Sequence, residues 1–306
     1  MRAGNGASGP DLAEIVPHMS IEPARVSARW GDLRARVLSA AVLVTVAVVC
    51  LQWGGWPWAG LVLLAAGGLG LEWGNLSLGR LTAPGGMALA GGLISGGLAF
   101  VLGYPPVALV LAVGGAALGG AIAGCAWRGA FLASGVLVLS PGIIGLLWLR
   151  DDPVAGFGNI LFVLLVVWSS DIGAYMTGRA FGGPKLAPAI SPGKTISGAL
   201  GGLAAASLMG ILAAAGLTVW AGAGAALGVL GRAALLGALL GAVLGVVAQI
   251  GDLAESWLKR HAGVKDSSQL IPGHGGLLDR LDALLVVVPV AGCLAWFLGR
   301  GVVLWG

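Results

Sequence analysis

The hydrophobic positions of this chain gather in long uninterrupted runs, separated by short polar segments. An α-helix needs about 17 to 25 apolar residues to cross the hydrocarbon core of a membrane, and the runs have lengths near that range. We read about nine of them, over residues 37–53, 57–77, 86–103, 105–127, 129–149, 157–178, 195–219, 227–250 and 283–304. The pattern therefore predicts an all-α bundle of about nine transmembrane helices.

The composition excludes a soluble domain. Of the 306 residues, 58% are hydrophobic and 10% are charged, whereas about a quarter of a soluble globular chain is charged. Glycine fills 56 positions, and small residues let helix backbones approach closely in a membrane. We expect this packing at Gly201, Gly202, Ala205 and Ala206, and at Gly237, Gly241 and Gly245. Such glycine-rich helix faces are also compatible with a homodimer.

The basic residues predict an orientation, because cytoplasmic loops collect Lys and Arg. With the N-terminus in the cytoplasm, all but three of the 17 basic residues fall on the inner side, and Arg150, Arg232 and Arg300 remain outside. The net charge of +4 is small, and we expect no nucleic-acid partner. Eight tryptophans near span ends read as interfacial anchors: Trp53, Trp56, Trp58, Trp73, Trp127, Trp148, Trp220 and Trp305.

Three regions follow from this organisation. Residues 1–36 form a cytoplasmic tail, residues 37–150 the N-terminal transmembrane helices, and residues 151–306 a C-terminal transmembrane region that carries the chemistry.

Charged side chains concentrate near the end of this third region. Asp252, Glu255 and Lys259 are spaced three and four residues apart, so they share a helix face if the span before them continues. Two carboxylates on one face suit Mg²⁺, which binds one or two carboxylates and bridges to substrate phosphates. The sequence therefore predicts a metal site beside a phosphate-containing substrate.

A glycine-rich turn follows, and a new helix begins with the run LLDRLDALLVVV. Free backbone N–H groups at such a helix start can bind phosphate, and His274 within the turn can donate to phosphate or act as an acid. Asp279 and Asp282 share a face of the new helix, and Arg280 stands between them. Acids for a metal and donors for phosphate, in a membrane protein, indicate phosphoryl or nucleotidyl transfer on a lipid.

Polar residues elsewhere give weaker signals. An acid inside a span is costly and normally faces a polar cavity or the bundle interior, so Asp171 is expected to line the lipid or nucleotide site, with a structural hydrogen bond as the alternative. Glu72 reads equally well as a boundary residue or a functional one. In the loop PKLAPAISPGKT, Lys194 and Ser191 are candidates for the triphosphate, although topology alone also explains the lysines.

Residues 256–282, SWLKRHAGVKDSSQLIPGHGGLLDRLD, resemble the signature of the phosphatidate cytidylyltransferase (CDP-diacylglycerol synthase) family, and every fixed position is filled. The stretches WSSDIGAYMTGRAFGGPKLAPAISPGKT (168–195) and LEWGNL (71–76) resemble the same family. One departure is that Ile196, Ser197 and Gly198 stand where many members have Trp-Glu-Gly. A role for that glutamate is not carried over.

The resemblance implies that CTP and phosphatidic acid react at the membrane to give CDP-diacylglycerol and pyrophosphate, with Mg²⁺ or Mn²⁺. It implies Asp252 and Asp279 as metal ligands, which the spacing also singles out, and we expect Glu255 and Asp282 to support them. Whether a monovalent cation takes part stays open. The catalytic set also includes His274 and Lys259. Phosphate contacts are expected from Lys259, Arg260, Lys265, His274, Gly275, Gly276 and Arg280.

Two other classes of protein share part of this pattern. A CTP-dependent lipid kinase of the polyisoprenol type would release CDP instead of pyrophosphate. A secondary transporter would place its site near mid-membrane between repeated halves, but no repeat is visible and the acids gather at one face. We expect a bacterial inner-membrane enzyme with a cytoplasmic active site.

Overall fold

The computed structural model describes residues 41–124, 126–222, 226–268, 270 and 275–306. The predicted tail 1–36, the start of the first predicted span and His274 lie outside this part of the chain. Within it, eight helices are long and apolar enough to cross a membrane, and a shorter apolar helix covers Ala41–Trp53. The predicted all-α membrane bundle is confirmed.

The helices follow the predicted spans closely except for α8 and α9. Their bounds are α2 Gly55–Leu78, α3 Pro84–Val101, α4 Pro105–Ala123, α5 Ala126–Arg150, α6 Gly156–Phe181, α7 Ile196–Trp220, α8 Leu227–His261 and α9 Leu278–Leu298. Helix α8 runs on beyond residue 250, and α9 starts before residue 283 and ends before residue 304. A short antiparallel hairpin, β1 Lys185–Ala187 and β2 Ser191–Thr195, joins α6 to α7.

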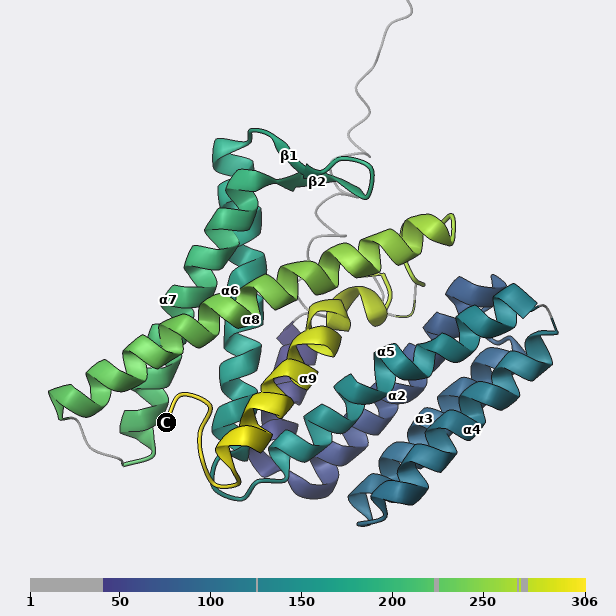
Figure 1. The fold of residues 1–306 in the computed structure, drawn as a ribbon, viewed down its shortest axis with the longest axis horizontal. Helices are drawn as coiled ribbons and strands as arrows, with labels where there is room; N and C mark the ends of the chain where they lie inside the picture. The colour runs from purple at the N-terminus through teal and green to yellow at the C-terminus, as the bar shows by residue number, and fades with distance from the viewer. Residues whose placement is uncertain (1–40, 125, 223–225, 269, 271–274) are drawn as a thin grey trace, which may run out of the picture.

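The helices form two groups with α9 between them (Figure 1). Helices α2 to α5 pack together, α6 to α8 pack together, and α9 contacts both α5 and α8. The hairpin and the connection from α8 to α9 lie at the same end of the bundle, at the top of Figure 1. We call this the signature end, because residues 256–282 pass through it.

Glycines bring the backbones of α7 and α8 together, as predicted. A Cβ atom on Gly210 would overlap the carbonyl oxygen of Gly237, and one on Gly241 would overlap that of Ala206. These small residues therefore serve packing within one chain. Since this packing explains them without a second copy, a homodimer stays a prediction.

The tryptophan prediction is correct in part. Trp53, Trp56, Trp127 and Trp220 are exposed, as interfacial anchors would be. Trp58, Trp73 and Trp305 are instead buried, and their indole N–H groups donate to Leu146 O, Phe131 O and Thr218 Oγ1. A tryptophan near a span end can pack inward when its N–H finds an acceptor.

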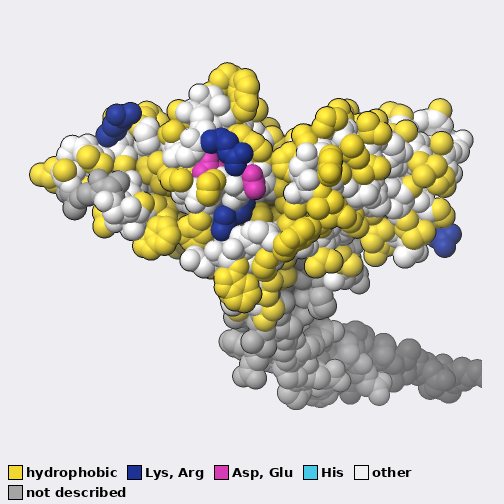
Figure 2. Space-filling view, turned by 90° about the horizontal axis from the view of Figure 1, so that it is seen from below, with side chains coloured by type: hydrophobic (Ala, Val, Ile, Leu, Met, Phe, Trp, Pro, Cys, Tyr) yellow, Lys and Arg dark blue, Asp and Glu magenta, His cyan; other side chains and the backbone are white. Residues whose placement is uncertain are grey.

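The opposite end, which we call the far end, is closed by the last residues of the chain. Helix α9 stops at Gly299, which has a φ of 94°, and the C-terminal segment then turns back over the loop between α5 and α6. There the buried Asp152 accepts hydrogen bonds from the backbone N–H groups of Val154 (2.9 Å), Ala155 (2.9 Å) and Gly301 (2.5 Å). Figure 2 shows this end as a mostly apolar surface with a small group of charged side chains.

Candidate active site

A close approach of α8 and α9 creates the site. A Cβ atom on Gly251 would lie 3.2 Å from the carbonyl oxygen of Asp282 and 3.3 Å from Cα of Ala283. The next residue, Asp252, has a carboxylate oxygen within 4.8 Å of one from Asp282 in the first turns of α9. Because α8 continues to His261, Glu255 and Lys259 stand on the same face, as the spacing predicts.

Three carboxylates meet across this contact. Asp252, Glu255 and Asp282 each offer an oxygen, and the three oxygens lie within 4.8 Å of one another. Glu255 is buried, and its Oε1 has no hydrogen-bond partner among the described residues. Clustered carboxylates repel one another, and a buried acceptor without a partner is unfavourable. Oxygen ligands of this kind suit a hard divalent cation, so the residues present fit a metal site.

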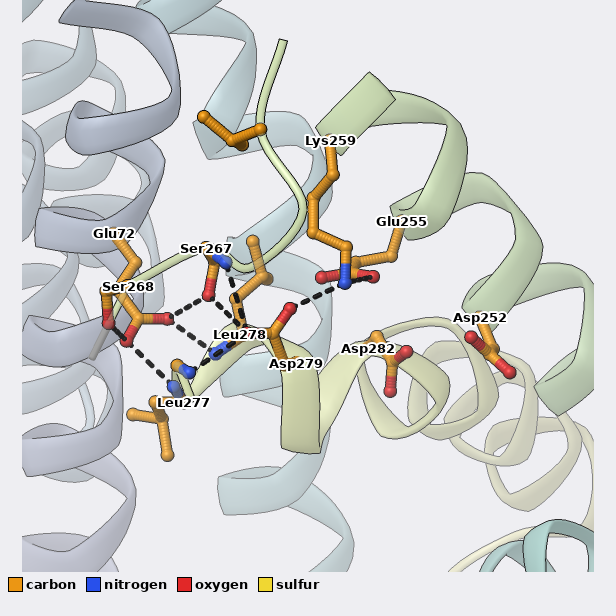
Figure 3. Close-up of polar contacts among 12 residues, drawn as sticks. Glu72, Asp252, Glu255, Lys259, Ser267, Ser268, Leu277, Leu278, Asp279 and Asp282 are labelled. Carbon is orange, nitrogen blue, oxygen red and sulfur yellow. Dashed lines mark hydrogen bonds and ion pairs between the residues drawn. The ribbon is translucent and has the colours of Figure 1, made fainter. Parts of the chain in front are cut away.

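Two lysines border the three acids. Lys259 Nζ lies 2.6 Å from Glu255 Oε2 and 2.6 Å from Asp279 Oδ1, and thus joins the two helices (Figure 3). Lys194 Nζ lies 2.5 Å from Asp252 Oδ2. Since Lys194 comes from β2, the hairpin places a cation from a distant part of the sequence against the three carboxylates.

The carboxylate of Asp279 is held by several donors at once. Its Oδ2 accepts hydrogen bonds from Gly276 N (2.9 Å), Ser267 N (3.1 Å) and Ser267 Oγ (3.1 Å). Its other oxygen is the one that contacts Lys259. Asp279 thus stands beside the three-acid group, joined to it through Lys259. That it binds the metal directly stays a prediction.

The remaining predicted residues are arranged around this centre. Asp171 on α6 interacts electrostatically with Asp252, Lys194 and Arg280. Gly275 has a φ of 81°, a conformation that glycine adopts at no steric cost.

Contacts of the outer residues are looser. The exposed Arg260 donates through Nε to Ile190 O (3.4 Å), next to Ser191 in the hairpin, and through Nη1 to Val264 O (3.1 Å). Lys265 is exposed. The structure thus gathers the acids and Lys194 and Lys259 tightly, and places Arg260 and Ser191 at the rim.

One residue has a larger part than its sequence position indicated. Glu72 on α2 is fully buried, and its carboxylate binds the residues on both sides of the connection between α8 and α9 (Figure 3). The usable signals were the acid within an apolar span and the LEWGNL stretch around it. Neither signal names its partners, which lie about 200 positions further along the chain.

Comparison with known proteins decides the family. The model of the family described as "Cytidylyltransferase family" matches residues 34–298. The chain belongs to this cytidylyltransferase family.

Similar proteins carry a more specific name. Proteins named phosphatidate cytidylyltransferase from Brucella suis and Brucella melitensis are each 40% identical over 264 residues, which cover 83% of this chain and 90% of the relative. One from Pseudomonas aeruginosa is 42% identical over 175 residues, which cover 57% of this chain and 60% of the relative. The family resemblance seen in the sequence is confirmed, and this cytidylyltransferase has its acids where α8 meets α9.

Proposed function

We propose that this protein transfers the cytidylyl group of CTP to phosphatidic acid, giving CDP-diacylglycerol and pyrophosphate for phospholipid synthesis. The observation that carries the proposal is the 40% identity to proteins named phosphatidate cytidylyltransferase over 83% of the chain. The acids and lysines at one end of a membrane bundle support it, because a lipid phosphate and a soluble nucleotide must meet at a membrane surface.

The reaction needs no side-chain nucleophile. An oxygen of the phosphatidic acid phosphate attacks the α-phosphorus of CTP, a new P–O bond forms, and the bond from the α-phosphorus to the bridging oxygen of the β-phosphate breaks. Pyrophosphate leaves with the electron pair. The protein must hold the two phosphate groups in line and reduce their mutual repulsion.

The described residues can meet both needs. Lys194 and Lys259 carry positive charge within 2.6 Å of the acids, so we assign them to the phosphates. Arg260 at the rim, with Lys265, Arg280, Gly275 and Gly276, extends this set toward the substrates. Asp171 is assigned to the wall of the site, opposite Asp252.

Asp252, Glu255 and Asp282 would hold Mg²⁺ or Mn²⁺, and Asp279 would complete the set from beside Lys259. When bound, such a cation would neutralise charge on the phosphates and orient them for in-line attack. Lys259, which lies between Glu255 and Asp279, supplies positive charge to the same group of carboxylates. We further propose that the signature end faces the cytoplasm of a bacterial inner membrane, where CTP is available.

The decisive experiment is an assay of purified protein in detergent with radiolabelled CTP, phosphatidic acid and Mg²⁺. We expect lipid-soluble cytidine and one pyrophosphate for each lipid converted. Release of CDP with a phosphorylated lipid would instead indicate a kinase. Asp279→Ala should abolish turnover in folded protein, whereas Asp151→Ala, which changes an exposed acid at the far end, should not. Full turnover by Asp279→Ala would remove the assignment of Asp279.

A further inference from the structure

Glu72 is a buried acid, and its hydrogen bonds to described residues all go to one segment. Its Oε1 accepts from Ser268 Oγ (2.6 Å) and Leu277 N (2.7 Å), and its Oε2 from Leu278 N (2.6 Å) and Ser267 Oγ (3.1 Å). A buried carboxylate is costly unless such donors satisfy it. The carboxylate of Glu72 accepts hydrogen bonds from these four donors, and none of the four belongs to α2. The side chain thus joins α2 to the connection between α8 and α9.

The donors belong to the two ends of that connection. Ser267 and Ser268 follow α8, whereas the N–H groups of Leu277 and Leu278 lie at the start of α9, where backbone donors have no partner within the helix. A negative charge there also complements the helix dipole. The carboxylate of Glu72 therefore fixes where α9 begins, and α9 carries Asp279 in its first turn and Asp282 in the next.

Ser267 connects Glu72 to the site directly. Its Oγ lies 3.1 Å from Glu72 Oε2 and 3.1 Å from Asp279 Oδ2, so the two carboxylates share the one proton that the hydroxyl can donate. Asn75, one turn after Glu72 on α2, donates through Nδ2 to Ser267 O (2.8 Å). A Cβ atom on Gly276 would overlap Ser267 Oγ and lie 2.9 Å from Glu72 Oε2. This packing leaves Ser267 and Gly276 little room to move relative to α2.

We infer that Glu72 is a positioning residue, which sets the start of α9 so that Asp279 meets Lys259 and Asp282 meets Asp252 and Glu255. Helix α2 thereby takes part in the site without contacting substrate. The effect that Glu72 has on turnover rests on the proposed function. Its effect on the acid cluster is a separate, measurable property.

The alternative is that Glu72 only stabilises the fold. The far end offers a matched control, because Asp152 is also a buried carboxylate that accepts backbone N–H groups and joins two segments. Asp152→Asn should lower stability without altering the site. Glu72→Gln keeps the size of the side chain but replaces one acceptor oxygen by a donating NH₂ group, which opposes two of the four donors.

The experiment measures Mn²⁺ binding to the full-length protein by the electron paramagnetic resonance signal of free Mn²⁺, without CTP. We expect Glu72→Gln to raise the Mn²⁺ dissociation constant about tenfold or more, as loss of a group that orients metal ligands does. Amide exchange should also accelerate in peptides covering 276–281. Asp152→Asn should leave both values unchanged.

A second variant keeps the inference testable if Glu72→Gln does not fold. Ser268→Ala removes one of the four donors and should change Mn²⁺ affinity in the same direction by a smaller factor. Wild-type affinity in the folded Glu72 variant, or in Ser268→Ala if only that variant folds, would overturn the inference, as would a wild-type protein that binds no Mn²⁺. If Mn²⁺ binds as expected but no CDP-diacylglycerol forms, the proposed function fails and the positioning role stands.

Discussion

The two ends of the bundle share one kind of contact, but its consequences differ between them. At each end a buried carboxylate accepts backbone N–H groups from a distant segment, Glu72 at the signature end and Asp152 at the far end. Beside Glu72 lie Asp279 and the three-acid group with its two lysines. Beside Asp152 lie the chain's last residues and an exposed ion pair of Arg300 with Asp151.

The difference between the two ends shows when hydrogen bonds to a buried carboxylate matter for function as well as for stability. At the far end, the hydrogen bonds of Asp152 are all local or to the C-terminal segment, so their loss costs stability alone. At the signature end, Glu72 holds α9, which carries Asp279 and Asp282. These acids lie beside other carboxylates that repel them, and a cation or a lysine must balance the negative charge. Changes at the two ends should therefore separate activity from stability.

Within the three-acid group, the largest expected loss of turnover comes from Asp252→Asn. This change removes one carboxylate of the three-acid group and the partner of Lys194, so turnover should fall about 100- to 1000-fold, as with loss of a major electrostatic contact. Radiolabelled lipid-soluble cytidine gives the rate. The folded fraction, measured by gel filtration in detergent, should match wild type. A rate within a few-fold of wild type would contradict the expectation that activity depends on the signature end and not on the far end.

Divalent cation should stabilise the wild-type protein and fail to stabilise Asp282→Asn. A ligand that binds only the folded state at 100 times its dissociation constant contributes about 2.7 kcal/mol. Thermal unfolding with and without Mg²⁺ measures this shift. Asp151→Asn at the far end should respond to Mg²⁺ as wild type does. Equal shifts in wild type and Asp282→Asn would place the cation elsewhere.

Gly276→Ala tests the packing between Ser267 and Glu72. The added methyl group would overlap Ser267 Oγ, so the start of α9 must move and turnover should fall about tenfold. Gly292→Ala within α9 is the control, because nothing lies within 4 Å of its Cβ position. That control should keep its activity and gain up to about 1 kcal/mol of stability. Equal activity of the two variants would show that the packing at Gly276 does not matter.

Sequence reasoning succeeded where helical periodicity carries the information. Nine apolar runs gave the helices, and the spacing of Asp252, Glu255 and Lys259 gave their shared face. Close packing at the glycines of α7 and α8 followed from their pattern, because small residues let helix backbones approach. The pattern did not show that these two helices pack against each other. The grouping of the chemistry near residues 252–282 followed from the scarcity of charge elsewhere.

The parts that sequence reasoning could not give depend on contacts between distant segments. Glu72 stayed ambiguous because its partners come from the other half of the chain. Trp58 and Trp73 read as interfacial anchors because an exposed and an inward-facing tryptophan look alike at a span end. The ion pair of Lys194 with Asp252 required the hairpin, which forms over too few residues to show a clear alternating pattern.

The smallest expected effect on activity comes from Asp152→Asn at the far end, which should act on stability in acid instead. Burial alone raises the pKa of Asp152, but the backbone N–H groups of Ala155, Gly301 and Val154, with the charge of Arg300, bring it below its ordinary value. A lowered pKa stabilises the fold above the unfolded-state value and loses this stabilisation as the pH falls below about 4. Wild-type protein should therefore lose stability in acid more steeply than Asp152→Asn.

The measurement is the unfolding midpoint at a series of pH values, with turnover at neutral pH as the second readout. Asp152→Asn should lower stability at neutral pH by about 1 kcal/mol, the net value of one hydrogen bond, while its turnover stays within about twofold of wild type. Because Asp152 touches none of the acids at the signature end, a larger loss of turnover would mean that the C-terminal segment communicates with the site along α9. The two ends would then have to be treated as one functional unit.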